Sequence, residues 1–190
     1  MATKTLGQIQ QEVGDWSVKN FGLQTSKANG IALGSLAPLL GIVEEIGELY
    51  DAVMDADKED ALADIGVYLC DFACREGAHL FYSSDEQIEK LRSDALISLL
   101  GKLSHVVLKH HQGIRGYDVE SKYITERDHI LGKIMAVLCR MCKAYLNKPY
   151  LEVLTKVWKD VSSRDWKKHS KEGMDEVDCL ALTFASIPKK

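Results

Sequence analysis

Proline and long apolar runs are scarce in this sequence. The 190 residues include three prolines, Pro38, Pro149 and Pro188, and each stands where a helix can begin or a chain can end. No apolar run approaches the roughly 18 residues that cross a bilayer, and residues 1–5 show no basic stretch followed by an apolar one. We therefore expect a cytoplasmic protein without membrane segments.

Cysteine and net positive charge are scarce as well. The five cysteines, an odd number, fit reduced thiols better than a disulfide framework. The 24 basic and 28 acidic residues give a net charge of -4, which argues against an electrostatic nucleic-acid binder. The 46% hydrophobic and 27% charged content is that of an ordinary globular protein. We expect one domain over residues 1–190, with a C-terminal tail of undefined structure at 174–190.

Strand signals are weak, whereas helical periodicity is strong. The Asn29-Gly30 pair does not join two alternating apolar runs, as a hairpin turn would. Apolar residues recur instead at spacings of three and four, which predict helices. The expected ranges are about 6–21, 36–53, 58–76, 86–110, 126–146 and 149–163, with Asp57 as N-cap of the third. The sequence thus predicts an all-α bundle of about five to six helices.

Carboxylates gather on one flank of the second expected helix. At about 100° per residue, Glu44, Glu45 and Glu48 share that flank, and Glu45 borders the apolar stripe. A charged flank is normal for an amphipathic helix. Taken alone, this flank would be interpreted as a solvated face.

The third expected helix strengthens a functional interpretation. Residues 61–74 hold no Lys, Arg, Glu or Gln, so most of this helix should be buried. Its acidic residues Asp64 and Asp71, with Asp60 one turn earlier, fall within about 40° of one another on a helical wheel. Unpaired buried carboxylates are costly, and no basic residue occurs in 31–57 or 59–74. These carboxylates therefore need a positively charged partner from elsewhere.

A short loop at residues 55–57 would fold the two helices antiparallel and bring the carboxylates together. Hard divalent cations are the simplest compensation, Mg²⁺ first and Mn²⁺ as an alternative. Because Mg²⁺ keeps several waters and takes substrate phosphates as further ligands, the implied chemistry is metal-assisted hydrolysis of a phosphoanhydride.

Three segments carry a resemblance to a known family. One is Glu45-x-x-Glu48 followed, after about a dozen residues, by an acidic segment that ends in Asp64 and by an apolar helix. The others are the opening stretch 11–21 and the closing stretch 157–166. Over about residues 6–76 and 150–173, the chain resembles the MazG-like all-α nucleoside triphosphate pyrophosphohydrolases, relatives of the dimeric dUTPases.

The resemblance implies a Mg²⁺-dependent enzyme that hydrolyses an NTP or dNTP to NMP and pyrophosphate, as in house-cleaning of the nucleotide pool. It also implies a homodimer or a dimer of dimers. Glu45 and Glu48 match the family's first metal-binding pair, and Asp64 matches its final metal ligand. The family's usual Glu three residues before that Asp is Ala61 here. Either Asp60 substitutes from the preceding turn, or the site holds fewer metal ions.

Further residues complete the expected site. We expect Glu44, together with Glu45, to act in catalysis by orienting or deprotonating the attacking water. Asp71 lies where many members of the family have a polar residue that points at the base. The remaining residues expected to bind substrate are Trp16, Lys19, Asn20, Arg164, Lys167 and Lys168.

Two other clusters have alternative interpretations. Cys139-x-x-Cys142 is spaced for zinc or redox chemistry, but its apolar helical surroundings favour buried small hydrophobes, as they do for Cys70 and Cys74. A histidine cluster could bind phosphate or metal, or could form a solvated helix end. Its members are His105, His110 and His111.

Two further functions compete with the enzyme. The acidic stripe would also suit a non-enzymatic helical interaction module that binds a basic partner. A zinc-binding regulator is the third hypothesis.

Overall fold

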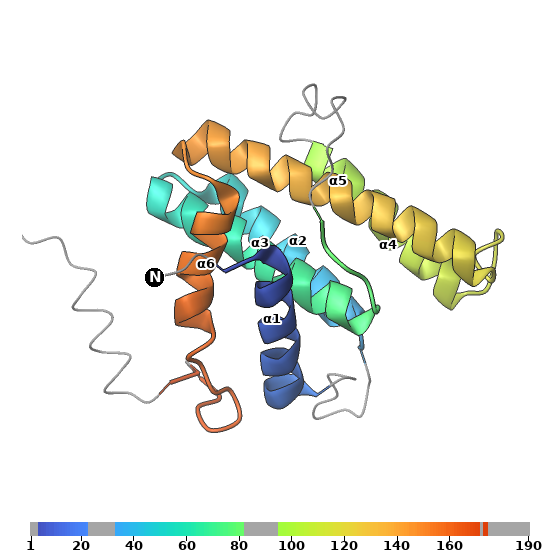
Figure 1. The fold of residues 1–190 in the computed structure, drawn as a ribbon, viewed down its shortest axis with the longest axis horizontal. Coiled ribbons are helices and arrows are strands. Elements are labelled where there is room, and N and C mark those ends of the chain that lie inside the picture. Colours follow the sequence, from blue (N-terminus) through green and yellow to red (C-terminus); the bar gives the residue numbers. More distant parts are fainter. Residues whose placement is uncertain (1–3, 23–32, 82–94, 172, 175–190) are drawn as a thin grey trace, which may run out of the picture.

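The computed structural model describes residues 4–22, 33–81, 95–171 and 173–174. In these residues the fold is all-helical, with six α-helices and no strand, which confirms the predicted fold class (Figure 1). The helices are α1 (Leu6–Phe21), α2 (Leu36–Asp51), α3 (Asp55–Arg75), α4 (Ala95–His111), α5 (Glu120–Leu146) and α6 (Tyr150–Val161). None of the described helices is both long and apolar enough to cross a bilayer.

Helix α3 is the centre of the bundle. It packs against α1, α2, α5 and α6, and its side chains Leu62, Ile65, Leu69 and Phe72 are fully buried. Helices α1 and α6 lie side by side on one part of α3, while α4 and α5 form a helical hairpin that extends away from them (Figure 1). The expectation that α3 is buried around most of its circumference is therefore confirmed.

The first helix begins and ends where the sequence predicts. Thr5 forms a capping box with Gln8: the Gln8 amide donates to Thr5 Oγ1 at 3.3 Å, and the Thr5 amide donates to Gln8 Oε1 at 2.8 Å. Gly22 follows the last turn with a φ of 76°, a left-handed value that glycine adopts without a Cβ clash.

Two helix starts differ from the sequence predictions. Helix α3 begins at Asp55 with Met54 as N-cap, so the link to α2 is residues 52–54 and Asp57 lies inside the first turn. Acidic side chains in a first turn interact favourably with the helix dipole, which accounts for the earlier start. Helix α5 begins at Glu120 rather than near residue 126, because the buried side chains of Tyr123 and Arg127 anchor its first turns to the core.

Part of the predicted fourth helix and most of the predicted tail lie outside the described residues. The structure describes α4 from Ala95 onward, so the expected start at residues 86–94 is not covered. Of the expected tail at 174–190, only Met174 is described.

Helix α6 approaches α3 closely at Gly66. A Cβ on Gly66 would lie 2.1 Å from Tyr150 Oη, and this hydroxyl donates a hydrogen bond to the Leu62 carbonyl at 3.0 Å. The side chain of Leu154 is also within 3.1 Å of that Cβ position. The absence of a side chain at residue 66 therefore allows the two helices to pack.

We predict that Gly66→Ala lowers the free energy of unfolding by about 1–3 kcal/mol, because overpacking of a filled core outweighs the better helix propensity of alanine. Urea denaturation measures the change. Gly47→Ala is the matched control, since a Cβ at that helical glycine meets nothing within 4 Å. A Gly66→Ala protein as stable as the wild type would contradict this account of the α3–α6 contact.

Candidate functional site between α1, α2, α3 and α6

The predicted carboxylates lie on the two helices that pack most extensively, α2 and α3. Glu45 faces the helix interface and is only 8% exposed, whereas Glu44 and Glu48 on the same helix are exposed. On α3, Asp64 is half-buried and Asp60 is exposed. We call Glu44, Glu45, Glu48, Asp60 and Asp64 the acidic cluster.

Members of the acidic cluster are close enough to influence one another's ionisation. Burial, together with the charges of Asp64, Glu48, Glu44 and Asp60, raises the pKa of Glu45 to about 8. Burial, together with the charge of Asp60, raises the pKa of Asp64 to about 6. Partial desolvation raises the pKa of Asp60 as well, although its side chain is exposed. Carboxylates of α2 and α3 are thus within electrostatic reach of one another.

The donor set of the acidic cluster suits a hard divalent cation. Its potential ligands are all carboxylate oxygens, which Mg²⁺ and Mn²⁺ prefer. Within the described parts of the chain, however, no group of three or more Asp, Glu, His or Cys side chains is arranged to hold a metal ion. The chemistry of the residues fits the cation, although their present side-chain positions do not form a cage.

Ala61 lies where the resemblance would place another metal ligand. Its side chain is buried in the core at 2% exposure. The neighbouring Asp60 raises the pKa of both Glu45 and Asp64 by its charge. Of the two residues, Asp60 is the one that belongs to the acidic cluster.

A cavity of about 150 Å³ lies beside the acidic cluster, between α1, α3, α6 and the segment that follows α6. Four of the predicted site residues line it together: Trp16, Asp64, Asp71 and Arg164. Other lining residues were not predicted, among them Tyr68, Arg75 and Trp166. We call this space the α1–α3–α6 cavity. It brings together residues as far apart in the sequence as Trp16 and Arg164.

Of the basic residues expected to bind substrate, Arg164 alone lines this cavity. Its Nε atom is buried and has no hydrogen-bond partner in the described parts of the chain. Its positive charge lowers the pKa values of Asp60 and Asp64, opposing the effect of burial. The backbone is fixed by Trp16, whose indole Nε1 donates to the Arg164 carbonyl at 3.0 Å. A buried guanidinium donor without a partner is suited to an anionic ligand.

Asp71 finds its positively charged partner on its own helix, whereas the sequence indicated one from elsewhere. Arg75, one turn later on α3, donates from Nε to Asp71 Oδ1 at 2.9 Å. The same guanidinium donates to Ser17 Oγ at 2.8 Å and to the Gly22 carbonyl at 3.2 Å, so it also joins α3 to the end of α1. The basic partner lies directly after the stretch 59–74 that lacks basic residues.

The other predicted substrate-binding residues do not line the cavity. Asn20 is buried, donates to the Trp16 carbonyl at 3.0 Å and accepts from the Trp166 amide at 2.8 Å, so its amide is used in packing the chain after α6 against α1. Lys19 and Lys168 are exposed, and both lie 3.8 Å from Asp165 Oδ2. Lys167 is exposed on the same segment.

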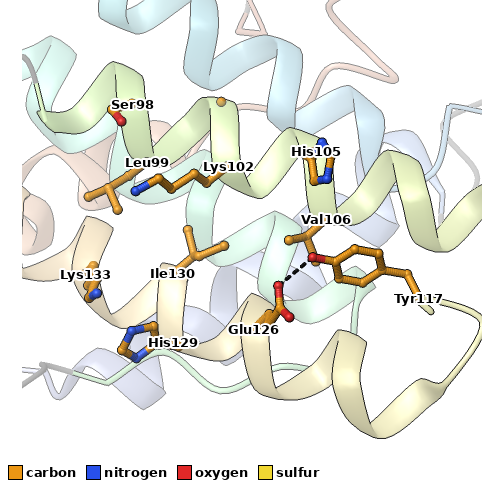
Figure 2. A pocket seen from close by; sticks show the side chains of 11 residues that line it. Ser98, Leu99, Lys102, His105, Val106, Tyr117, Glu126, His129, Ile130 and Lys133 are labelled. Atoms are coloured by element: carbon orange, nitrogen blue, oxygen red, sulfur yellow. Dashed lines mark hydrogen bonds between the residues drawn. The ribbon is translucent and has the colours of Figure 1, made fainter. Parts of the chain in front are cut away.

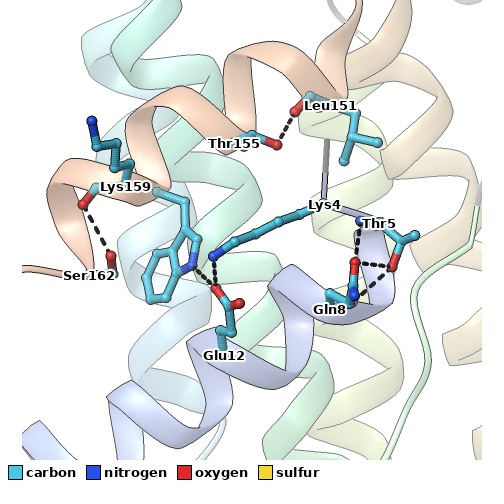
Figure 3. A network of polar contacts seen from close by, with 9 residues as sticks. Lys4, Thr5, Gln8, Glu12, Leu151, Thr155, Lys159 and Ser162 are labelled. Atoms are coloured by element: carbon cyan, nitrogen blue, oxygen red, sulfur yellow. Dashed lines mark hydrogen bonds and ion pairs between the residues drawn. The ribbon is translucent and has the colours of Figure 1, made fainter. Parts of the chain in front are cut away.

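A polar network fixes α1 against α6 and thereby positions Trp16. Lys4 Nζ and the indole Nε1 of Trp158 both donate to Glu12 Oε2, at 2.5 Å and 2.7 Å (Figure 3). The ring of Trp158 meets the ring of Trp16 edge-on, with 5.8 Å between their centroids. These contacts hold one wall of the α1–α3–α6 cavity in place.

The cysteine and histidine clusters lie away from this cavity. Burial raises the pKa of the Cys139 thiol to about 12, so this residue is not a thiolate at neutral pH, and Cys142 is buried beside it. His110 is held by packing, with its ring stacked on Tyr123 at 3.9 Å and its Nδ1 2.7 Å from the Tyr117 carbonyl.

Comparisons of the chain with family models, with curated proteins and with solved structures find no match. The functional interpretation therefore depends on the residues and on their arrangement.

The raised pKa of Glu45 predicts a pH-dependent effect of Glu45→Gln on stability. The folded carboxyl has a pKa of about 8 and the unfolded one about 4.5, so between these values the folded state holds more protons and wild-type stability falls as the pH rises. Glutamine does not titrate. We expect Glu45→Gln to gain roughly 1–2 kcal/mol relative to wild type between pH 5 and pH 8, after allowance for solvent screening.

Chemical denaturation of both proteins in the presence of EDTA measures this difference. Glu152→Gln, which removes an exposed carboxylate on α6, is the control for the loss of one negative charge. A difference between Glu45→Gln and wild type that is the same at both pH values would contradict the assignment of Glu45 as a buried member of the acidic cluster.

Proposed function

We propose that this protein is a Mg²⁺-dependent nucleoside triphosphate pyrophosphohydrolase of the MazG-like type, which converts an NTP or dNTP to NMP and pyrophosphate. The observation that carries the proposal is the placement of Arg164. Arg164, whose buried Nε has no partner among the described residues, and Asp64 line the same cavity, beside the rest of the acidic cluster. A site with a carboxylate cluster for a cation and an arginine for an anion suits a metal–phosphate substrate.

In this proposal Glu45, Glu48 and Asp64 hold the cation, Mg²⁺ or Mn²⁺, and Asp60 assists them. When bound, the cation supplies charge that neutralises phosphate oxygens and makes a water molecule more acidic. The exposed carboxylate of Glu44 orients the attacking water and accepts its proton, with Glu45 beside it.

The remaining residues bind and enclose the nucleotide. Arg164 donates from Nε to phosphate oxygens, and the partly buried ring of Trp16 forms an apolar wall for the base. The exposed lysines Lys19, Lys167 and Lys168 supply positive charge near the segment after α6. Asn20 serves by positioning Trp166 rather than by touching substrate.

We also propose that the protein is a homodimer or a dimer of dimers. An exposed apolar stripe along α2 supports this: its members are Leu36, Leu40, Val43 and Tyr50. They follow helical spacing and flank the exposed carboxylates of the acidic cluster. Sedimentation equilibrium of wild type and of Leu40→Glu measures the oligomeric state, and a monomeric wild type would contradict the proposal.

Calorimetric titration with Mn²⁺ tests the enzyme against its main alternative, an interaction module that uses the acidic cluster to bind a basic partner. The enzyme predicts binding of Mn²⁺ to wild type that is lost in Asp64→Asn and retained in Asp118→Asn, which changes an exposed aspartate between α4 and α5. Absence of metal binding, together with no hydrolysis of any common nucleotide, would favour the module.

Asp71→Asn is expected to change which base is preferred. Ionised Asp71 only accepts hydrogen bonds, whereas asparagine both donates and accepts, so the order of kcat/KM among the four bases should shift by roughly 1–3 kcal/mol while Mg²⁺ dependence stays the same. Kinetics with the four nucleotides measure this. Because Asp71 pairs with Arg75, a uniform loss with an unchanged order, accompanied by lower stability, would show that Asp71 is structural.

A further inference from the structure

A second and larger cavity lies between α4 and α5, the helices of the hairpin that extends from the bundle. Its volume is about 580 Å³, which is within the range of small-molecule sites. All of its lining residues come from α4, from α5 or from the segment between them (Figure 2). It therefore shares no residue with the α1–α3–α6 cavity, and nothing in the proposed hydrolysis uses it.

One end of this cavity is basic. Lys102 on α4 and Lys133 on α5 approach it from the two facing helices, and His129 lies next to Lys133 on the same side (Figure 2). The chain as a whole carries a net charge of -4, so this basic end differs in charge from the chain as a whole. The positive charges of Lys102 and Lys133 attract an anionic group.

The other end is aromatic and held in place. The Tyr117 ring is 7% exposed and meets the His105 ring edge-on with 6.1 Å between centroids. The Tyr117 hydroxyl donates to Glu126 Oε2 at 2.6 Å, and Lys122 Nζ lies over the Tyr117 ring, 4.2 Å from its centroid. Glu126, the carboxylate that lines the cavity, is thus engaged by Tyr117 at the end away from the two lysines (Figure 2).

An apolar floor joins the two ends. It is formed by Leu99 and Val106 of α4 and by Ile130 of α5. A ligand that fills the cavity therefore meets cations at one end, apolar side chains along its length and aromatic rings at the other end. This polarity selects an elongated molecule with a negative charge at one end only.

We propose that the α4–α5 cavity binds a small organic anion in which a phosphate or carboxylate group is joined to a planar ring. The anionic group lies between Lys102 and Lys133, and the ring packs on Ile130 and against Tyr117. Binding here requires no metal ion, since the acidic cluster contributes nothing to this cavity.

Binding experiments in EDTA test the proposal, with AMP and 2-naphthoate as the two anionic probes. Adenosine, which has the ring without the anion, and inorganic phosphate, which has the anion without the ring, are the matched comparisons. We expect AMP, 2-naphthoate or both to bind at least 10-fold more tightly than adenosine and phosphate. The identity of the tighter probe tells whether the natural ligand carries a phosphate or a carboxylate.

Two variants locate the binding. Lys102→Met/Lys133→Met should weaken it at least 10-fold, whereas Lys109→Met/Lys143→Met, which removes two lysines of the same helices outside the cavity, should not. Gly101→Leu adds a side chain to the cavity wall on α4, at a position where a Cβ meets no atom within 4 Å, and it should abolish binding in a folded protein. Absence of binding by both probes, or equal binding by the two double variants, would overturn the proposal.

Discussion

Glu48→Gln is expected to lower kcat/KM for nucleotide hydrolysis at least 100-fold, more than the roughly 10–100-fold loss that is typical when a residue supporting a metal ligand is removed. The folded protein should remain as stable as the wild type or become more stable. Glu48 is exposed, and its charge contributes to the raised pKa values of Glu45 and Asp64. Glutamine keeps the size of the side chain and removes one of the repelling charges, so repulsion within the metal-free cluster falls while metal affinity is lost.

Steady-state kinetics at saturating Mg²⁺ and thermal unfolding in EDTA measure the two effects. Asp51→Asn is the matched control, because it removes an exposed carboxylate one turn further along α2, outside the acidic cluster. Retained turnover in Glu48→Gln, with a melting temperature lowered by many degrees, would show that Glu48 is structural and not a metal ligand.

Arg164→Met is expected to raise KM for the nucleotide and to lower kcat/KM about 100-fold. The wild-type guanidinium is partly desolvated already, and its Nε has no partner to give up when a phosphate arrives. The bond to phosphate is therefore gained at little cost. Arg164→Lys should recover part of the loss, since lysine keeps the charge but not the planar set of donors.

Lys171→Met is the control for net charge, because Lys171 is an exposed lysine on the segment after α6 that also carries Arg164. The position of the backbone can be checked independently through Trp16, whose indole donates to the Arg164 carbonyl and whose fluorescence reports on that contact. An Arg164→Met protein with wild-type kinetics would remove the observation on which the proposed function depends.

The helices with clear terminal signals were predictable from sequence. Thr5, Gln8 and Gly22 bracket α1, and its predicted range of 6–21 is confirmed. The start of α5 was missed because residues 120–125 contain mostly polar residues, and the anchor that keeps them helical is Tyr123, whose burial comes from packing with other parts of the chain. Periodicity within one segment does not contain that information.

The candidate site was predictable in part. Carboxylates of α2 and α3 come close enough to raise the pKa values of Glu45 and Asp64, as expected for two helices joined by a short link. Tyr68 was missed although it lies one turn after Asp64 on the same stripe, because an aromatic residue on an apolar helix is normally part of the core. Arg75 was missed because it lies just beyond the stretch 59–74 that lacks basic residues, so the partner of Asp71 was expected on another part of the chain.

Asn20 shows why residue type alone does not identify a substrate-binding residue. An amide next to a tryptophan suits nucleotide binding, but here both ends of the amide are occupied by the backbone of Trp16 and Trp166. Those partners come from segments that are close only in the folded chain. Arg164, in contrast, keeps a donor without a partner, a property that the sequence does not reveal.

Phosphorus NMR of a panel of canonical and damaged nucleoside triphosphates, incubated with the protein and Mg²⁺, tests the central claim most directly. We predict that at least one nucleotide gives pyrophosphate and the nucleoside monophosphate together, without a diphosphate intermediate, and that EDTA or Glu48→Gln stops the reaction. Release of inorganic phosphate with a nucleoside diphosphate, or no change in any nucleotide of the panel, would contradict the assignment of the acidic cluster and Arg164 to pyrophosphohydrolysis.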